Sequence, residues 1–200
     1  MTILVMRHGH KAEGDFFNPK LRHQDPPLSE EGNNKAKSIV PYFSERAISS
    51  IYTSQYLRTQ QTIEPLSKSL NISIEEDLRL NELNNGFIDN MTEKEFKTKF
   101  PAEWEAYNAR TADFRFPGGE TGKEASERIE SFLIEKRVKH KNENILVVSH
   151  DGLIRVCMCV LLGIPVFHRG DFKVDLFGLT EIDFQVDVGR WKLLGFNNVI

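Results

Sequence analysis

The sequence predicts an α/β fold, a three-layer sandwich with a mostly parallel central sheet and helices on both faces. Short runs rich in β-branched residues alternate with stretches of helical periodicity along the 200 residues. Three of these runs each precede a helical stretch, and the middle of the chain adds a further helical segment. A chain of this length can form one large core with an insertion. We therefore expect residues 1–200 to form a single domain with a helical insertion at about residues 80–120.

The first expected strand covers residues 3–6 and leads directly into Arg7, His8 and Gly9. A loop follows, and Ser29 is the expected N-cap of the first helix because its hydroxyl can accept a hydrogen bond from an unpaired helical amide. The apolar face of that helix consists of Ala36, Ile39, Val40 and Phe43.

Two more strand-to-helix units have the same organisation. Residues 48–53 form the second expected strand, and the helix after it carries Arg58 in its first turns. Residues 145–148 give the strongest strand pattern. They are followed by Ser149, His150, Asp151 and Gly152 and then by an apolar helix.

The middle of the chain contains two Thr-x-x-Glu capping boxes. The box at 92–95 opens a helix with Phe96 and Phe100 on one side, and Pro101 breaks it. The box at 121–124 opens a longer helix whose apolar face is Ala125, Ile129, Phe132 and Leu133. Near the end, residues 179–184 and 191–196 suit an antiparallel hairpin or edge strands.

Composition excludes several classes of function. The net charge of −3 and the pI near 6.1 provide no basic field for nucleic acid or an anionic membrane. The longest apolar run, 153–165, is too short to span a bilayer and is interrupted by Arg155. Residues 1–6 do not have the pattern of a signal peptide. The two cysteines, at i and i+2 of an expected helix, do not suit a disulfide. We expect a cytoplasmic protein, and the sequence does not indicate an oligomeric state.

Arg or His follows each of the three strongest strands. Ligands in open α/β sheets bind beyond the carboxyl ends of the strands, so Arg7, His8, Arg58 and His150 should meet at one edge. A single His or Arg at such a position is more often structural or solvated. Four together suit a dianionic oxyanion, because guanidinium donors match phosphate oxygens. Gly9 and Gly152, beside the histidines, would let the backbone approach that group.

Six motifs in this order resemble the histidine phosphatase (phosphoglycerate mutase-like) superfamily. The motifs are Arg7-His8-Gly9, Leu28 to Gly32, Thr53 to Thr62, Leu80 to Glu82 with Gly86, Pro117 to Thr121, and Val147 to Arg155. The triplet alone is weak, whereas the ordered set across residues 3–155 is specific. The resemblance implies that the helical insertion covers an active site.

The resemblance also implies roles for individual residues. His8 would attack phosphorus and carry the phosphoryl group, with a pKa lowered by Arg7 and Arg58. Those arginines and His150 would hold the phosphoryl oxygens. Glu82 would protonate the leaving alcohol and then activate water, although by itself it reads as a surface carboxylate. No metal and no cofactor are expected, and the ligand is a small phosphorylated metabolite or inorganic phosphate.

The chain also departs from the family pattern. His10-Lys11 replaces the usual residues after the triplet, Asp151 replaces a commoner Gly, and the loop at 12–22 differs. Lys11, Asn18 and Gly152 are the candidate substrate contacts outside the central group, with Arg22 beside them. Three other classes compete with a phosphatase: a phosphoglycerate mutase-type phosphotransferase, an inactive phosphate-sensing or interaction domain, and a metal hydrolase. The last lacks a His pair or carboxylate cluster in the sequence. The substrate is not indicated.

Overall fold

A six-stranded sheet forms the centre of the computed structural model, which describes residues 1–200 apart from the side chain of Asn90. The strand order is β5-β4-β6-β1-β7-β8. The strands are β1 (Thr2–Arg7), β4 (Ile48–Thr53), β5 (Ile74–Glu76), β6 (Asn144–Ser149), β7 (Gly178–Gln185) and β8 (Arg190–Val199). β5, β4, β6 and β1 are mutually parallel, whereas β7 and β8 are antiparallel additions at the β1 edge. The expected α/β class and the C-terminal hairpin are confirmed.

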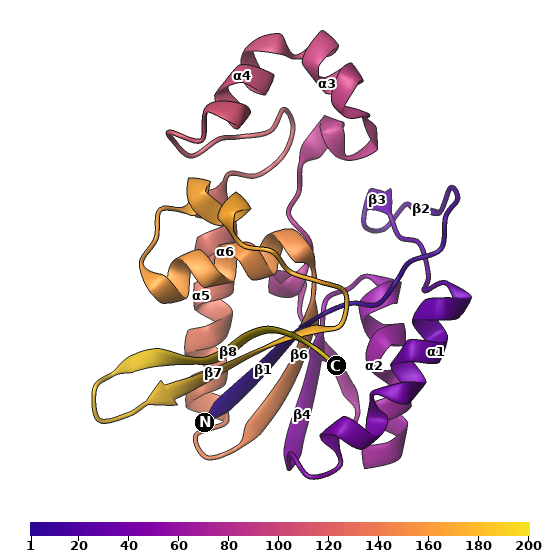
Figure 1. Cartoon of the computed structure of the whole chain (residues 1–200), viewed down its shortest axis with the longest axis vertical. Coiled ribbons are helices and arrows are strands. Elements are labelled where there is room, and N and C mark those ends of the chain that lie inside the picture. The colour runs from indigo at the N-terminus through magenta and orange to yellow at the C-terminus, as the bar shows by residue number, and fades with distance from the viewer.

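Helices cover both faces of this sheet (Figure 1). α1 (Glu30–Ser38) and α2 (Leu57–Leu70) lie on one face, and α5 (Gly122–Lys139) and α6 (Asp151–Leu162) lie on the other. The side chains of β1 alternate between the two layers: Ile3 and Val5 pack with α5 and α6, while Leu4 and Met6 pack with α1 and α2. Each such buried side chain contributes about 1.5–3 kcal/mol.

Local signals fix the ends of several helices. Ser29 caps α1 by accepting from the amide of Gly32, and both Thr-x-x-Glu boxes form reciprocal hydrogen bonds. α1 ends at Ser38, earlier than its apolar pattern suggested. Residues 40–43 continue as a 3₁₀ helix, η1 (Val40–Phe43), because Pro41 provides no amide hydrogen for an α-helix. Val40 is only half-buried as a result.

The insertion consists of η3 (Gly86–Asn90), α3 (Glu93–Lys99) and α4 (Pro101–Ala109). Figure 1 shows α3 and α4 at the upper end of the molecule, beyond α6 and the β2–β3 loop. β2 (Phe17–Asn18) and β3 (His23–Gln24) form a small separate hairpin. Two further 3₁₀ helices flank other elements. η2 (Leu78–Leu80) precedes the insertion, and η4 (Val166–Asp171) follows α6.

Two further features concern the helices. Both cysteines are buried free thiols on α6. Among the described residues, no helix has the length and apolar content needed to cross a membrane.

Candidate active site

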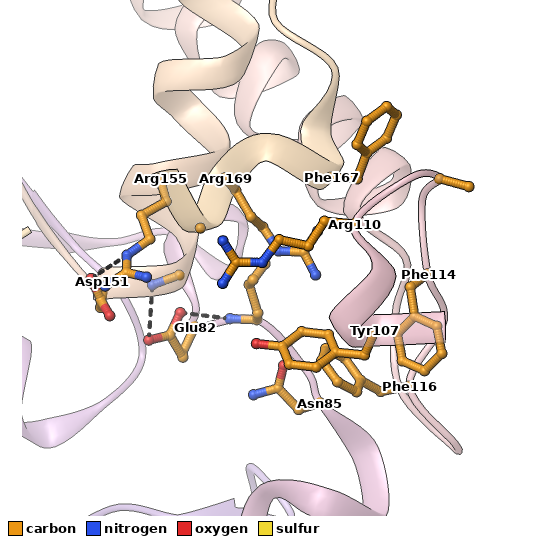
Figure 2. Close-up of a pocket in the computed structure, with 14 residues that line it drawn as sticks. Glu82, Asn85, Tyr107, Arg110, Phe114, Phe116, Asp151, Arg155, Phe167 and Arg169 are labelled. Atoms are coloured by element: carbon orange, nitrogen blue, oxygen red, sulfur yellow. Dashed lines mark hydrogen bonds and ion pairs between the residues drawn. The ribbon is translucent and has the colours of Figure 1, made fainter. Parts of the chain in front are cut away.

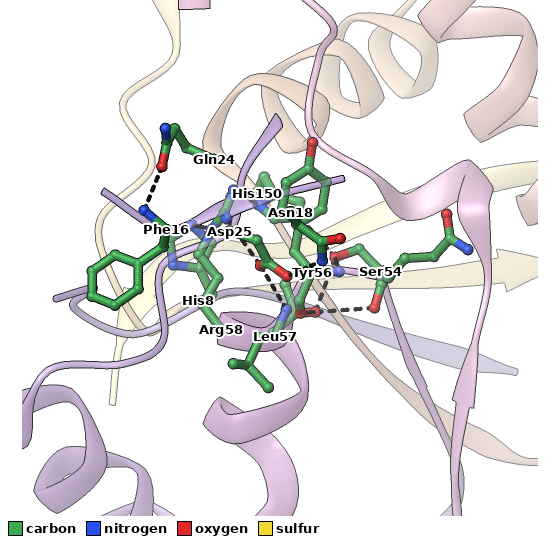
Figure 3. Close-up of polar contacts among 12 residues, drawn as sticks. His8, Phe16, Asn18, Gln24, Asp25, Ser54, Tyr56, Leu57, Arg58 and His150 are labelled. Carbon is green, nitrogen blue, oxygen red and sulfur yellow. Dashed lines mark hydrogen bonds and ion pairs between the residues drawn. The ribbon is translucent and has the colours of Figure 1, made fainter. Parts of the chain in front are cut away.

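The carboxyl ends of β1, β4 and β6 meet below a cavity of about 200 Å³. Because these strands are parallel, the residues that follow them lie at one edge of the sheet. Arg7, His8 and Arg58 line the cavity, and His150 lies behind them with its ring centroid 5.1 Å from that of His8. The four basic residues expected to meet are therefore brought together, and Figure 3 shows three of them, His8, Arg58 and His150.

His8 has one ring nitrogen fixed by the backbone. Nδ1 lies 2.8 Å from the carbonyl oxygen of Gly9, which can only accept, so Nδ1 carries the proton and Nε2 keeps its lone pair. The amide of Gly9 in turn donates to the Thr62 hydroxyl at 2.9 Å. Burial, Arg58 and Arg7 lower the pKa of His8 from 6.5 to about 3. His8 is therefore neutral at physiological pH, with a lone pair on Nε2.

Arg58 connects the two histidines. Its Nε lies 3.2 Å from Nε2 of His8, and its Nη2 lies 3.1 Å from Nδ1 of His150. The guanidinium also lies 4.3 Å from the ring centre of Tyr56. Burial lowers the pKa of Arg58, while Glu82 acts in the opposite direction. This position, the second residue of α2, presents the guanidinium to the cavity.

Two buried donors at this site have no hydrogen-bond partner among the described residues. They are Nε of Arg7 and Nη1 of Arg58, out of three such buried side-chain atoms in the described part of the chain. A buried donor without an acceptor costs free energy, which an oxyanion between the two guanidiniums would offset. Buried N–H donors that lack an acceptor and lie among positively charged side chains suit the binding of a phosphoryl group.

His150 lies beside both His8 and Arg58. Its Nδ1 faces Arg58, which only donates, so the proton is on Nε2 and is donated to the Ser54 hydroxyl at 2.8 Å. The side chain is fully buried and does not line the cavity. Burial and Arg58 hold its pKa well below the usual range. In this arrangement Nδ1 of His150 accepts a hydrogen bond from Arg58.

Glu82 lies in the segment after η2, and its carboxyl group meets the N-terminus of α6. Oε1 accepts from the amides of Leu83 and Leu153 at 2.9 and 3.2 Å, and Oε2 accepts from the amide of Gly152 at 3.4 Å. Burial nevertheless raises its pKa above the usual range. A carboxyl group with a raised pKa at the cavity wall can act as a proton donor.

The remaining candidate substrate contacts differ in whether they line the cavity. Lys11 lines the cavity from its mouth, and burial and Arg58 lower its pKa. A Cβ at Gly152 would lie 2.8 Å from Oε1 of Glu82, so the absence of a side chain there makes room for that carboxyl group. Asn18 and Arg22 do not line the cavity.

Asn18 instead reaches the site through Asp25, a residue that the sequence analysis did not identify. The Asn18 amide donates to Asp25 at 3.0 Å, and Asp25 accepts from the amide of Leu57 at 2.9 Å (Figure 3). The same carboxylate lies 3.8 Å from Nη1 of Arg58. This chain of contacts fixes the start of α2 and orients Arg58.

Tyr56, His23 and Asp89 also line the cavity without having been identified from the sequence. Nδ1 of His23 lies 3.2 Å from Oδ2 of Asp89, a contact that joins the β2–β3 hairpin to the insertion. Tyr56 lies two residues before Arg58 in a motif already recognised, and that proximity was the available signal. Among the described residues, no group of three or more His, Cys, Asp or Glu side chains is placed to hold a metal ion.

Comparison with known proteins gives consistent matches. The model of the histidine phosphatase superfamily (branch 1) matches residues 3–199. Phosphoserine phosphatase 1 of Hydrogenobacter thermophilus is 30% identical over 188 residues, covering 92% of this chain and 87% of that protein. A protein named "Probable phosphoglycerate mutase GpmB", from Shigella dysenteriae, is 27% identical, with 92% and 86% covered.

The fold also matches solved structures. A mutant of phosphoserine phosphatase from Entamoeba histolytica, in complex with phosphoserine, aligns with a TM-score of 0.83. The identity is 17%, and the alignment covers 99% of this chain and 97% of the other. At this identity the match concerns the fold alone.

Proposed function

The chain belongs to branch 1 of the histidine phosphatase superfamily, and we propose that it hydrolyses a small phosphomonoester through a phosphohistidine at His8, without a metal. The substrate in this proposal is a small phosphorylated metabolite, and no cofactor takes part. The curated relatives include a protein named as a phosphatase and one named as a mutase. Residues 1–200 act as one catalytic domain in this proposal, with residues 80–120 as the cover of the site.

The observation that carries the proposal is the state of His8 beside the guanidinium groups of Arg7 and Arg58. Its Nδ1 proton is committed to Gly9 and its pKa is about 3, so the Nε2 lone pair persists at neutral pH. Nε of Arg7 and Nη1 of Arg58 are the unpartnered donors next to it. Such donors are suited to the charge on a phosphoryl group in transfer, a role that metal ions fill in many other enzymes.

The first step forms a bond between Nε2 of His8 and phosphorus and breaks the bond from phosphorus to the ester oxygen. Arg58 Nε now contacts Nε2, so it shifts from the ring to a phosphoryl oxygen as the bond forms. Glu82 supplies the proton that the leaving oxygen takes up. The raised pKa of Glu82 keeps that proton available.

The second step reverses these roles. The Glu82 carboxylate removes a proton from water, and the water oxygen attacks phosphorus as the bond to His8 breaks. Inorganic phosphate leaves, His8 regains its lone pair, and Glu82 is again protonated. His150 acts in this scheme as a positioning residue, because it holds Arg58 against His8.

A mutase-type transfer is the second candidate, and the relative named as a phosphoglycerate mutase favours it. A mutase must protect the phosphohistidine from water and return the phosphoryl group to the same carbon skeleton. Net release of phosphate from 3-phosphoglycerate or another monoester supports the phosphatase, while isomerisation without release supports the mutase. Phosphate binding with no turnover of any substrate would instead indicate an inactive sensor.

The test is hydrolysis of p-nitrophenyl phosphate by the purified full chain. We expect turnover that is unchanged by EDTA, inhibited by vanadate and abolished in His8→Ala. His10→Ala serves as the control, since His10 is exposed, bonds to Ser29 and does not line the cavity. Loss of activity in EDTA with recovery in a divalent cation would refute the metal-independent reaction.

A further inference from the structure

A second cavity of about 240 Å³ adjoins the first, and Glu82 and Leu83 are in the walls of both. Its wall carries three guanidiniums, which come from the end of α4, from α6 and from η4: Arg110, Arg155 and Arg169. Figure 2 shows these side chains around the same space as Glu82 and Tyr107. Cations from three distant segments thus gather beside the proposed proton donor.

These guanidiniums keep most of their donors unused. Arg155 donates through Nε to Asp151 at 2.8 Å, and Arg169 donates through Nη1 to the carbonyl of Val166 at 3.2 Å. Arg110 makes one long contact of 3.4 Å with Asp171. Among the described residues, no other hydrogen bond from these three side chains is found, so several N–H groups remain for a ligand.

The carboxyl groups nearby neutralise this wall only in part: Asp171 lies 3.4 Å from Arg110, and Asp151 is the other carboxylate in contact with the wall. The raised pKa of Glu82 favours its uncharged form, and Asp151 is shared between Arg155 at 2.8 Å and Arg7 at 3.9 Å. Gly170 leaves space for the guanidinium of Arg110. A Cβ at this position would lie 3.0 Å from Cζ of Arg110, so the guanidinium packs against backbone that carries no side chain. The cavity therefore keeps a net positive character.

Aromatic rings form the rest of the wall. Phe116 is buried, and its ring centroid lies 5.2 Å from that of Tyr107 and 4.9 Å from that of Phe114. Phe167 contributes a further ring. Apolar faces of this kind pack against the carbon skeleton of a ligand, while the guanidiniums bind its charged end.

We propose that the alcohol released from the substrate carries a second anionic group, a carboxylate or a phosphate, which binds to Arg110, Arg155 and Arg169. The inference rests on the proposed function, because Glu82 then protonates the ester oxygen and the carbon attached to that oxygen must lie on the Glu82 side. The second cavity begins there. The structure thus favours substrates with two separated anionic groups over simple phosphomonoesters.

The test compares matched aryl phosphates. 4-Carboxyphenyl phosphate and hydroquinone bisphosphate carry the second anion, and 4-carbamoylphenyl phosphate is the neutral counterpart of the first. Hydrogen bonds to charged groups are stronger than those to neutral groups, although screening at exposed sites offsets part of the gain. We therefore expect kcat/KM to be at least about tenfold higher for an anionic substrate than for the neutral one. The ratios for the carboxylate and the bisphosphate distinguish the two kinds of anion, and added salt should lower both.

The variants are Arg110→Gln and Arg169→Gln, each of which removes one guanidinium and keeps a polar side chain. Each should lower the anionic-to-neutral ratio of kcat/KM by about tenfold. Lys97→Gln is the control: it removes one positive charge from α3 of the same insertion, is exposed and does not line the cavity. Its ratio should equal that of the wild type.

Two outcomes would overturn the inference, and they are distinguishable. Hydrolysis of p-nitrophenyl phosphate with an anionic-to-neutral ratio near one, unchanged in both arginine variants, would refute the second anion site and leave the proposed function intact. No hydrolysis of any aryl phosphate would refute the proposed function, and with it the inference.

Discussion

Glu82→Gln tests the proposed proton donor while keeping the shape of the site. Oε1 of Glu82 accepts from the amides of Leu83 and Leu153, and the amide oxygen of Gln can take both bonds. The NH₂ group of Gln then faces the amide of Gly152, across the longest of the three contacts at 3.4 Å. We therefore expect the variant to fold, with a thermal melting curve close to that of the wild type.

The size of the effect depends on the leaving group. A positioned acid–base group contributes about 10²–10⁴ in rate, and phenol, with a pKa of about 10 like that of Tyr, needs the proton when it leaves. For phenyl phosphate we expect kcat/KM to fall by about 10²–10⁴. p-Nitrophenol is far more acidic, so its release from p-nitrophenyl phosphate should change much less. The slow step then becomes hydrolysis of the phosphohistidine, for which Glu82 is the base.

Rapid-mixing kinetics provide the assay. Glu82→Gln mixed with p-nitrophenyl phosphate should release a burst of nitrophenol equal to the enzyme concentration, followed by slow turnover. Glu127→Gln, an exposed change on α5, is the control and should behave as the wild type. Equal losses for phenyl and p-nitrophenyl phosphate, with no burst, would refute the assignment of Glu82 to proton transfer.

The remaining predictions concern pH and stability. In the wild type, kcat/KM should fall as pH rises through the raised pKa of Glu82, because the proton donor loses its proton. Glu82→Gln should remove this alkaline fall in kcat/KM, and an unchanged fall would contradict the assignment. Arg58→Met should raise the pKa of His8 above about 3, read by NMR of the imidazole nitrogens, because one cation beside the ring is gone; a pKa that stays or falls would contradict that cause. Phe132→Ala should lower the free energy of unfolding by about 3–5 kcal/mol in urea, against about 0.5 kcal/mol or less for the exposed Ile134→Ala on the same helix. Similar values for the two would contradict the packing.

The fold was predictable where local signals agree with burial. β1 and β6 are continuous apolar runs because both faces of the sheet are covered. The two capping boxes placed the starts of α3 and α5 correctly. The short strands β2, β3 and β5 were not predicted, since two or three residues provide no periodicity to recognise.

The central basic group was also predictable, because parallel strands must bring the residues that follow them to one edge. Asp25 was not, since its partner Arg58 lies 33 residues further along and no pattern in the loop joins them. The second cavity was equally inaccessible: Arg110, Arg155 and Arg169 come from three elements that only the tertiary packing brings together. The position of His150 behind Arg58 likewise depends on side-chain directions that the sequence does not contain.

The most direct test of the chemistry is to trap the phosphoryl group on the protein. Glu82→Gln is mixed with p-nitrophenyl phosphate, quenched in alkali and analysed by intact-protein mass spectrometry and peptide mapping. We expect one phosphoryl group on the peptide that contains His8, stable in alkali, lost in acid and absent from the Glu82→Gln/His8→Ala double variant. A phosphoryl group that survives acid, or that maps to any other residue, would contradict nucleophilic attack by His8.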